Sequence, residues 1–115
     1  MPRELTSAGI LLASNNYYLL GCPSHRTGTT GGWGILKGRT DETDENLLAT
    51  ALREFYEESS LRLDTMDNLV IERDPFYSYH VEGKDRIGKF LKTVYVFRAY
   101  DDTATLYERD DNLKC

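Results

Sequence analysis

The sequence has few of the residues that mark secreted, zinc-binding or membrane proteins. It contains two cysteines, Cys22 and Cys115, and two histidines among 115 residues. Two cysteines do not make a disulfide framework, so we expect a reduced protein without a disulfide, and isolated histidines disfavour zinc. No apolar run approaches the roughly 18 residues of a membrane span, and the first residues lack the apolar core of a signal peptide. We therefore expect a cytoplasmic protein without a membrane partner.

Positive charge is in deficit. The chain has 14 Lys and Arg residues against 19 Asp and Glu, a formal net charge of −5, and the basic residues do not cluster. Such a surface repels a nucleic-acid backbone, so we expect no nucleic-acid partner. An acidic protein can still bind a phosphorylated small molecule when a metal ion carries positive charge to the site.

A chain of 115 residues closes a single hydrophobic core, so we expect one domain over residues 1–115. The pair Asn15-Asn16 between two apolar runs predicts the turn of a hairpin. A Ser-, Thr- and Gly-rich loop is expected at 23–32 and a charged turn at 81–89. The expected strands lie at residues 7–14, 17–21, 69–72, 76–80 and 92–100, with a further buried segment at 33–36.

One amphipathic helix is predicted between these strands. It begins near Glu45, after a polar loop at 37–44 whose Thr43 or Asp44 is a suitable N-cap, and it ends at about Ser59. One side of the helix is apolar, as expected for a helix that packs on a sheet. This apolar stripe comprises Leu47, Leu48, Ala51, Leu52 and Phe55.

Three glutamates of the predicted helix, Glu54, Glu57 and Glu58, are spaced three and four residues apart. This spacing places their carboxylates on one helix face, where like charges repel. A divalent cation would reverse the repulsion, and ligands that are all oxygen suit a hard ion such as Mg²⁺, with Mn²⁺ as a substitute. The alternative is a solvated acidic face without a ligand.

The residues around the glutamates argue against that alternative. The chain has Gly38, six residues, Glu45 and seven residues, followed by the run Arg53-Glu54-Phe55-Tyr56-Glu57-Glu58-Ser59-Ser60-Leu61. This pattern resembles the Nudix box, in which Gly, five residues, Glu and seven residues precede Arg-Glu, two residues, Glu-Glu, any residue, Gly and an aliphatic residue. A multi-residue pattern with fixed spacing is far more specific than a lone glycine motif.

Two positions depart from the Nudix pattern. The first gap holds six residues instead of five, so that Asp44 is an alternative to Glu45 as the first acid. Ser60 stands where the family has the glycine that ends the helix in a left-handed conformation. A serine there costs on the order of 1 kcal/mol or shifts the helix end, so this departure concerns stability more than chemistry.

Further segments resemble the dinucleoside tetraphosphate hydrolases within this family. They are Trp33-Gly34-Ile35-Leu36-Lys37-Gly38 before the box and Lys92-Thr93-Val94-Tyr95-Val96-Phe97 after it. The resemblance implies an α+β fold, a Nudix-like α/β/α sandwich with a central mixed β-sheet and the Nudix loop-helix. Family members usually carry a second helix after the last strands, which we expect to be short or missing here.

The resemblance also implies roles for the box residues. Glu54, Glu57 and Glu58 would coordinate the metal, with the Gly38 carbonyl as a further ligand, and one of them or a later acid would deprotonate the attacking water. Arg53 would orient a glutamate, the alternative being a surface pair with Glu57. Glu45 would orient the loop before the helix, and Gly38, Glu45 and Ser60 are the structural positions of the motif. The catalytic candidates are therefore Glu57, Glu54 and Arg53.

Two further groups of candidates lie outside the helix. An acid after the last strand completes the metal site in many relatives, and Glu108 and Asp110 are the candidates, with a solvated tail as the alternative. Lys37 and Arg39 flank the box glycine and would reach phosphate oxygens. Tyr77 or Tyr79 would stack on a base, because alternate residues of a strand face the same side.

The expected activity is hydrolysis of a diphosphate linkage in a nucleotide-like small molecule. The favoured substrate is diadenosine tetraphosphate, cleaved to ATP and AMP. The alternatives are ADP-ribose, a nucleotide sugar or a nucleoside triphosphate, and a nucleotide-binding module without catalysis, which the three retained acids disfavour. The oligomeric state stays open between monomer and homodimer.

Overall fold

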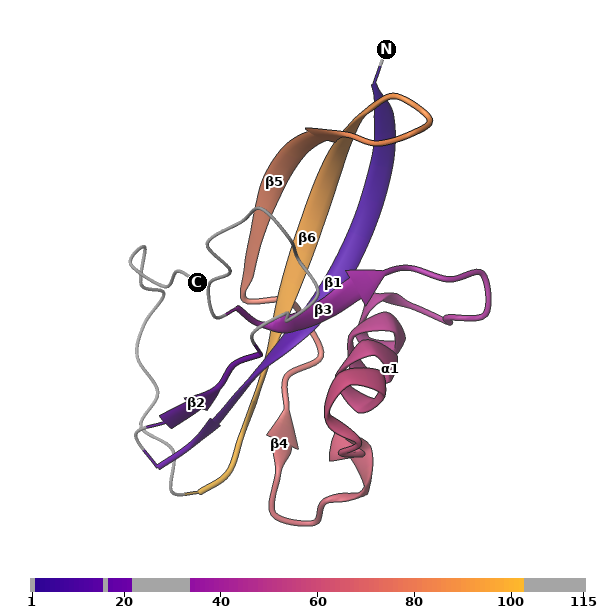
Figure 1. Cartoon of the computed structure of the whole chain (residues 1–115). Helices are drawn as coiled ribbons and strands as arrows, with labels where there is room; N and C mark the ends of the chain where they lie inside the picture. Colours follow the sequence, from indigo (N-terminus) through magenta and orange to yellow (C-terminus); the bar gives the residue numbers. More distant parts are fainter. Residues whose placement is uncertain (1, 16, 22–33, 103–115) are drawn as a thin grey trace.

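Two twelve-residue strands, β1 (Arg3–Ser14) and β6 (Lys89–Tyr100), form the centre of the computed structural model, which describes residues 2–15, 17–21 and 34–102. They run parallel along their whole length, from Arg3 opposite Phe90 to Ala13 opposite Tyr100 (Figure 1). Parallel strands buried on both faces are rich in apolar residues, as are the middle parts of these two. The whole domain is arranged around this pair.

Each central strand carries two shorter antiparallel strands on its outer edge. On β1 these are β3 (Leu36–Arg39) and β2 (Tyr17–Leu19), and on β6 they are β5 (Tyr77–Lys84) and β4 (Val70–Ile71). Among the described residues the sheet therefore has six strands, and their mixed direction confirms the predicted mixed sheet. The β1–β2 hairpin is also confirmed, with Ser14 opposite Tyr17 and the left-handed Asn15 (φ 55°) between them.

The helix α1 (Leu47–Ser59) covers one face of the sheet and is the one α-helix of the described residues. Beneath it lies a core cluster to which the 3₁₀ helix η1 (Leu63–Thr65) adds Leu63. Apolar side chains of the helix meet those of the two central strands here, and their burial is the main stabilising contribution of this layer. The cluster comprises Ala8, Ile10, Ala51, Phe55, Leu63, Phe97 and Ala99.

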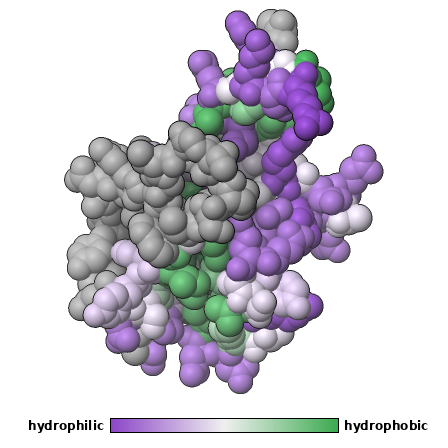
Figure 2. Space-filling model, in the orientation of Figure 1, coloured by the Kyte–Doolittle hydropathy of each residue, from purple (hydrophilic) through white to green (hydrophobic). Residues whose placement is uncertain are grey.

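The opposite face of the sheet carries a second cluster, formed by Leu11, Val94 and Val96. The alternation along β6 assigns Val94 and Val96 to this face and Phe97 and Ala99 to the helix face, as the sequence predicts for a strand covered on both sides. In Figure 2, apolar surface gathers between β2 and α1, with polar surface on either side. None of the helices in the described part is both long and apolar enough to span a bilayer.

The structure corrects three boundaries, the first of which is the start of the helix. The helix begins at Leu47, and its N-cap is Asn46, whose side chain accepts a hydrogen bond from the Ala49 backbone at 2.8 Å. The prediction of Thr43 or Asp44 as the cap and of a start near Glu45 was wrong. The Asp44 carboxylate is bound elsewhere, as described below, and cannot cap the helix.

The second correction concerns the segment 81–89, for which the sequence predicts a turn. Strand β5 continues to Lys84, opposite Lys89 of β6, and the turn is confined to residues 85–88. Charged side chains are no obstacle to an exposed edge strand, because the pairing depends on backbone hydrogen bonds and the side chains reach solvent. Likewise β3 extends to Arg39, into the segment predicted as a polar loop.

Candidate active site

The Glu54 carboxylate of α1 lies directly against Gly38 of β3. A Cβ atom at Gly38 would lie 2.0 Å from the carboxyl carbon of Glu54 and 2.1 and 2.3 Å from its oxygens. Such separations are far inside van der Waals contact. Glycine is therefore the residue at position 38 that leaves room for this carboxylate, whose side chain is only 16% exposed.

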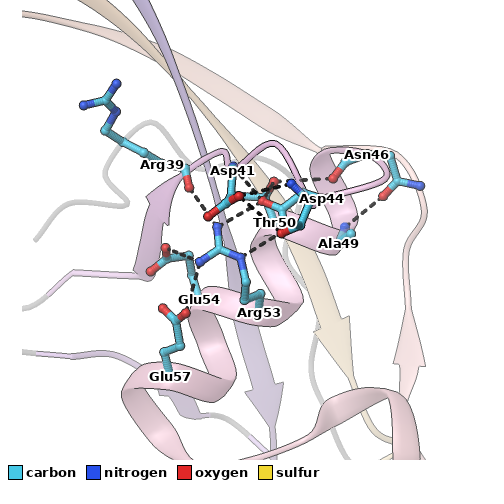
Figure 3. A network of polar contacts seen from close by, with 10 residues as sticks. Arg39, Asp41, Asp44, Asn46, Ala49, Thr50, Arg53, Glu54 and Glu57 are labelled. Carbon is cyan, nitrogen blue, oxygen red and sulfur yellow. Dashed lines mark hydrogen bonds and ion pairs between the residues drawn. The ribbon is translucent and has the colours of Figure 1, made fainter.

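The guanidinium of Arg53 is the hub of the site, and all five of its N–H groups have an acceptor (Figure 3). The acceptors are both carboxylate oxygens of Asp44, the Arg39 carbonyl, Glu54 Oε1 and Glu57 Oε1, at 2.9 to 3.1 Å. Arg53 therefore joins the helix to the end of β3 and to the loop between them. Hydrogen bonds to these carboxylates raise its pKa.

Asp44 is the acid that holds this loop in place. Arg53 binds both of its oxygens, and its Oδ2 also accepts hydrogen bonds from the Thr50 hydroxyl at 2.8 Å and the Asp41 backbone N–H at 2.9 Å. The side chain of Asp44 is 7% exposed. Its bonds to Arg53 lower the pKa of the carboxyl well below its usual range, against the opposing effect of burial. Asp44 therefore stays ionised.

These contacts assign the loop-orienting role to Asp44 and not to Glu45, which is exposed. Residues 39–43 separate Gly38 from Asp44, which is the five-residue gap of the Nudix pattern. The additional residue lies after Asp44, where the chain bends before Asn46 caps the helix. The contacts of Asp44 therefore agree with the alternative alignment, in which Asp44 is the first acid of the box.

The three glutamates differ in their surroundings. Glu54 and Glu57 both accept from Nη1 of Arg53, but the Glu57 side chain is 52% exposed. Burial, together with the charge of Glu54, raises the pKa of Glu58, while Lys37 acts in the opposite sense through its charge and a backbone hydrogen bond. Glu54 is thus fixed against β3, Glu57 reaches solvent and Glu58 lies beside Lys37.

The donor set fits a hard divalent cation, because every available side-chain ligand is a carboxylate oxygen. Within the described residues no three acidic, His or Cys side chains are gathered closely enough to hold a metal ion by themselves. Waters and substrate phosphates commonly complete such a site. Burial and the negative charge of Glu54 raise the pKa of Glu58, and a bound cation would relieve the repulsion between the two carboxylates.

The predicted substrate-binding residues occupy the sheet face opposite α1. The pairing register places Lys37 opposite Gly9, Gly9 opposite Val96 and Val96 opposite Tyr77, so that Lys37 and Tyr77 end one row across four strands. Three strand spacings separate them by about 14 Å. The next row joins Arg39 to Tyr79 in the same way, through Ser7 and Val94.

Side-chain orientation separates these residues from the acids. Lys37 and Arg39 lie on one side of β3, whereas Gly38 faces Glu54 on the other, and Figure 3 shows the Arg39 side chain pointing away from the glutamates. The tyrosines are half-buried against the second cluster, with ring centroids 6.0 Å apart. Glu58 beside Lys37 connects the two sides.

Several sequence-based candidates lie outside the described residues. They are Glu108 and Asp110, the candidates for a further metal ligand, and Trp33, the first residue of the segment before the box. Conversely, Thr50, which is polar and buried on the helix, was not predicted from the sequence. A polar residue one turn before Arg53 and Glu54 was the signal that could have indicated it.

A family model of the NUDIX domain matches residues 3–113. The chain belongs to the NUDIX family. The match confirms the predicted family and, with it, the class of enzyme, a pyrophosphohydrolase acting on nucleoside diphosphate derivatives. Nudix hydrolases generally use divalent metal ions. No match was found among curated proteins.

Solved structures with the same fold have low sequence identity to this chain. The Caenorhabditis elegans Ap4A hydrolase has a TM-score of 0.54 and 18% identity over 93% of this chain and 76% of its own. The Escherichia coli ORF135 protein has a TM-score of 0.60 and 13% identity, covering 95% and 71%. Shewanella oneidensis NrtR has a TM-score of 0.53 and 22% identity over 81% of this chain and 42% of its own. At these identities the likeness shows the fold alone.

Proposed function

We propose that this Nudix domain hydrolyses diadenosine tetraphosphate to ATP and AMP with Mg²⁺, for which Mn²⁺ can substitute. The observation that carries the proposal is the Arg53 hub, which holds Glu54 against Gly38 and contacts Glu57 on the same helix face. A structural ion pair would not require a glycine to make room for a carboxylate. A constellation that positions several acids at one place is typical of a catalytic site.

Each residue has a role in the proposed reaction. Glu54, Glu57 and Glu58, with the Gly38 carbonyl, would hold the cation, which when bound neutralises diphosphate oxygens and lowers the pKa of water. Glu57 is the more exposed of the two glutamates on Arg53 and is better placed to accept a proton from the attacking water. Water oxygen bonds to phosphorus, and the bridging P–O bond breaks.

The two rows of residues across the sheet, from Lys37 to Tyr77 and from Arg39 to Tyr79, support a dinucleotide substrate. A base would stack on Tyr77 or Tyr79, and the phosphate chain would extend toward Lys37 or Arg39 and then around the outer edge of β3 to the glutamates. The fold of the nematode Ap4A hydrolase is similar. Stacking tolerates different bases, so guanosine analogues should also be cleaved.

Hydrolysis of ADP-ribose is the second candidate. The NUDIX domain of Shewanella oneidensis NrtR has been crystallised with ADP ribose, and its structure matches this chain with a TM-score of 0.56 at 19% identity. A nucleotide sugar or a nucleoside triphosphate also offers a base and a diphosphate. All of these substrates would be cleaved at the same carboxylates. The residues that would discriminate between them are therefore the basic residues and tyrosines of the two rows across the sheet.

A substrate panel tests the assignment. Diadenosine polyphosphates, ADP-ribose, nucleotide sugars and nucleoside triphosphates are compared by kcat/KM with Mg²⁺, and the products are separated by chromatography. Diadenosine tetraphosphate should rank first and yield ATP and AMP. A preference of about tenfold or more for ADP-ribose or a triphosphate would leave only the hydrolase class standing.

A tyrosine substitution tests the base-stacking residue. Stacking contributes about 1 to 3 kcal/mol per base, so Tyr77→Ala or Tyr79→Ala should raise KM for diadenosine tetraphosphate about tenfold and largely spare kcat. Tyr17→Ala is the matched control, since Tyr17 is 77% exposed on β2 at the other edge of the sheet. Equal KM values in all three variants would remove both tyrosines from the substrate site.

A further inference from the structure

We propose that Thr50 is a positioning residue for the metal-binding carboxylates and that it acts through Asp44 and Arg53. The inference rests on the proposed function, because it assumes that Glu54 and Glu57 bind a divalent cation. It concerns a hydroxyl that touches neither the cation nor the substrate.

Thr50 is fully buried on α1, with 0% exposure. A buried hydroxyl needs a partner, and its Oγ1 donates to Asp44 Oδ2 at 2.8 Å, whereas the Asn46 carbonyl of the preceding turn is at 3.4 Å. A hydroxyl has a single proton to donate, and the shorter contact is the one to Asp44. An interior helix position is better served by Ala or Leu than by a β-branched Thr, so the hydroxyl itself is the feature to explain.

The contact to Thr50 completes the surroundings of Asp44. Its Oδ2 accepts from Thr50, from the Asp41 backbone and from Arg53 Nη2, while Oδ1 accepts from Arg53 Nε. The carboxylate is thereby held from three directions, and it in turn fixes the plane of the guanidinium.

That plane decides how Arg53 meets the glutamates. Only Nη1 reaches them, with one contact to Glu54 Oε1 and one to Glu57 Oε1, so that each carboxylate keeps an oxygen that Arg53 does not bind. Without the Thr50 hydroxyl, Asp44 loses one of its restraints and the guanidinium can shift toward the glutamates. A fuller pairing with Arg53 would compete with the cation for the same oxygens.

A set of four side chains at position 50 separates the hydroxyl from the methyl group. Thr and Ser have the hydroxyl, Val and Ala do not, and Thr and Val have the methyl that Ser and Ala lack. Mn²⁺ binding is measured by electron paramagnetic resonance on wild type, Thr50→Val, Thr50→Ser and Thr50→Ala without substrate, and thermal unfolding is followed by circular dichroism.

We expect Mn²⁺ affinity to fall only in the variants that lack the hydroxyl at position 50. Removing a group that orients metal ligands typically costs 10- to 100-fold in affinity, and Thr50 acts two contacts further away, through Asp44 and Arg53, so Val and Ala should weaken Mn²⁺ binding about three- to tenfold. Ser should stay within about twofold of wild type, although its lost methyl lowers the melting temperature. If Val does not fold, the Ser and Ala pair gives the same comparison.

Other outcomes contradict the proposal. Mn²⁺ affinities that follow the melting temperatures instead of the hydroxyl would make Thr50 a packing residue, and wild type that binds no Mn²⁺ would remove its role altogether. Because binding is measured without substrate, the two claims fail separately. Hydroxyl-dependent Mn²⁺ binding without diphosphate cleavage refutes the proposed function alone, and cleavage with equal affinities refutes the role of Thr50 alone.

Discussion

Two arginine–aspartate pairs lie in different regions of the molecule and use the same groups. In each pair the guanidinium contacts both carboxylate oxygens. Arg3–Asp85 ties the start of β1 to the β5–β6 turn, at the end of the sheet far from α1 (Figure 1). Arg53–Asp44 ties the loop before α1 to the helix.

The pairs differ in burial and in what surrounds them. The side chain of Asp85 is 39% exposed, against 7% for Asp44. Arg53 has further acceptors in the glutamates and the end of β3, whereas Arg3 lies beside a solvent-exposed turn. Solvent screens the exposed pair, which therefore contributes little, whereas hydrogen bonds between charged groups that are partly shielded from water contribute more. The same type of ion pair thus joins two surface segments in one region, whereas in the other it positions the side chains of the candidate site.

The largest expected contrast concerns chemistry. Glu57→Gln should lower kcat by about three orders of magnitude or more with little change in melting temperature, because it removes a proposed metal ligand and proton acceptor from an exposed position. Glu82→Gln on the exposed face of β5 is the control from the other region. A Glu57→Gln enzyme with wild-type kcat would show that the glutamates of α1 are a solvated helix face.

The next contrast concerns stability. Asp44→Asn should destabilise the fold by about 2 to 3 kcal/mol, because the part-buried Arg53 loses its charged partner and the hydrogen bonds to it. Asp85→Asn should have a much smaller effect, because solvent screens the exposed pair. In a domain of this size the loss at Asp44 corresponds to roughly 10 °C of melting temperature. Equal losses of unfolding free energy in the two variants would show that the Arg53–Asp44 pair is no more important to the fold than the exposed Arg3–Asp85 pair.

The pH dependence of stability tests the Arg53–Asp44 pair in a second way. The folded-state pKa of Asp44 is depressed below its ordinary value of 3.8, so its stabilisation is fully present above about pH 5 and is lost as the pH falls below 4 toward the folded-state pKa. Wild type should therefore lose stability on acidification more steeply than Asp44→Asn. Parallel profiles of unfolding free energy against pH would contradict the assigned ion pair.

A pair of glycine substitutions separates activity from stability. Gly38→Ala should displace the flexible Glu54 carboxylate, lowering kcat about tenfold or more with little loss of stability. Gly88→Ala lies in the distal turn at φ 144° with open space around it, so it should lower stability by about 1 kcal/mol and spare kcat. The reverse pattern would mean that Gly38 serves the fold only.

The smallest expected effect concerns the end of the helix. Ser60 has φ 64° and ψ 16°, a left-handed conformation that costs a serine more than a glycine. Ser60→Gly should raise stability by roughly 0.5 to 1 kcal/mol, or a few degrees of melting temperature. An unchanged or lower melting temperature would show that the strain at Ser60 is compensated elsewhere.

Elements with a local cause could be predicted from the sequence. The Asn15 turn, the apolar stripe of the helix and the two-sided pattern of β6 each follow from a period or a residue type that the structure uses directly. The family resemblance indicated the glutamates and Gly38 but not why the glycine is required, since the approach of Glu54 depends on how α1 packs against β3.

The features that sequence reasoning missed depend on competition between neighbours. Asp44 and Asn46 are both suitable N-caps, and only the tertiary contact with Arg53 decides that Asp44 does not cap. That same contact makes Asp44, and not Glu45, the first acid of the box. The charged residues of β5 gave no strand signal, because the pairing with β6 and not their composition places them in the sheet.

Metal dependence of turnover tests the central claim most directly. Hydrolysis of diadenosine tetraphosphate by wild type is followed after removal of divalent ions with excess chelator and again on addition of Mg²⁺ or Mn²⁺. The arrangement of glutamates around Arg53 predicts no measurable turnover in chelator and full recovery with either ion. Undiminished turnover in excess chelator would contradict the assignment of these carboxylates to a metal-dependent active site.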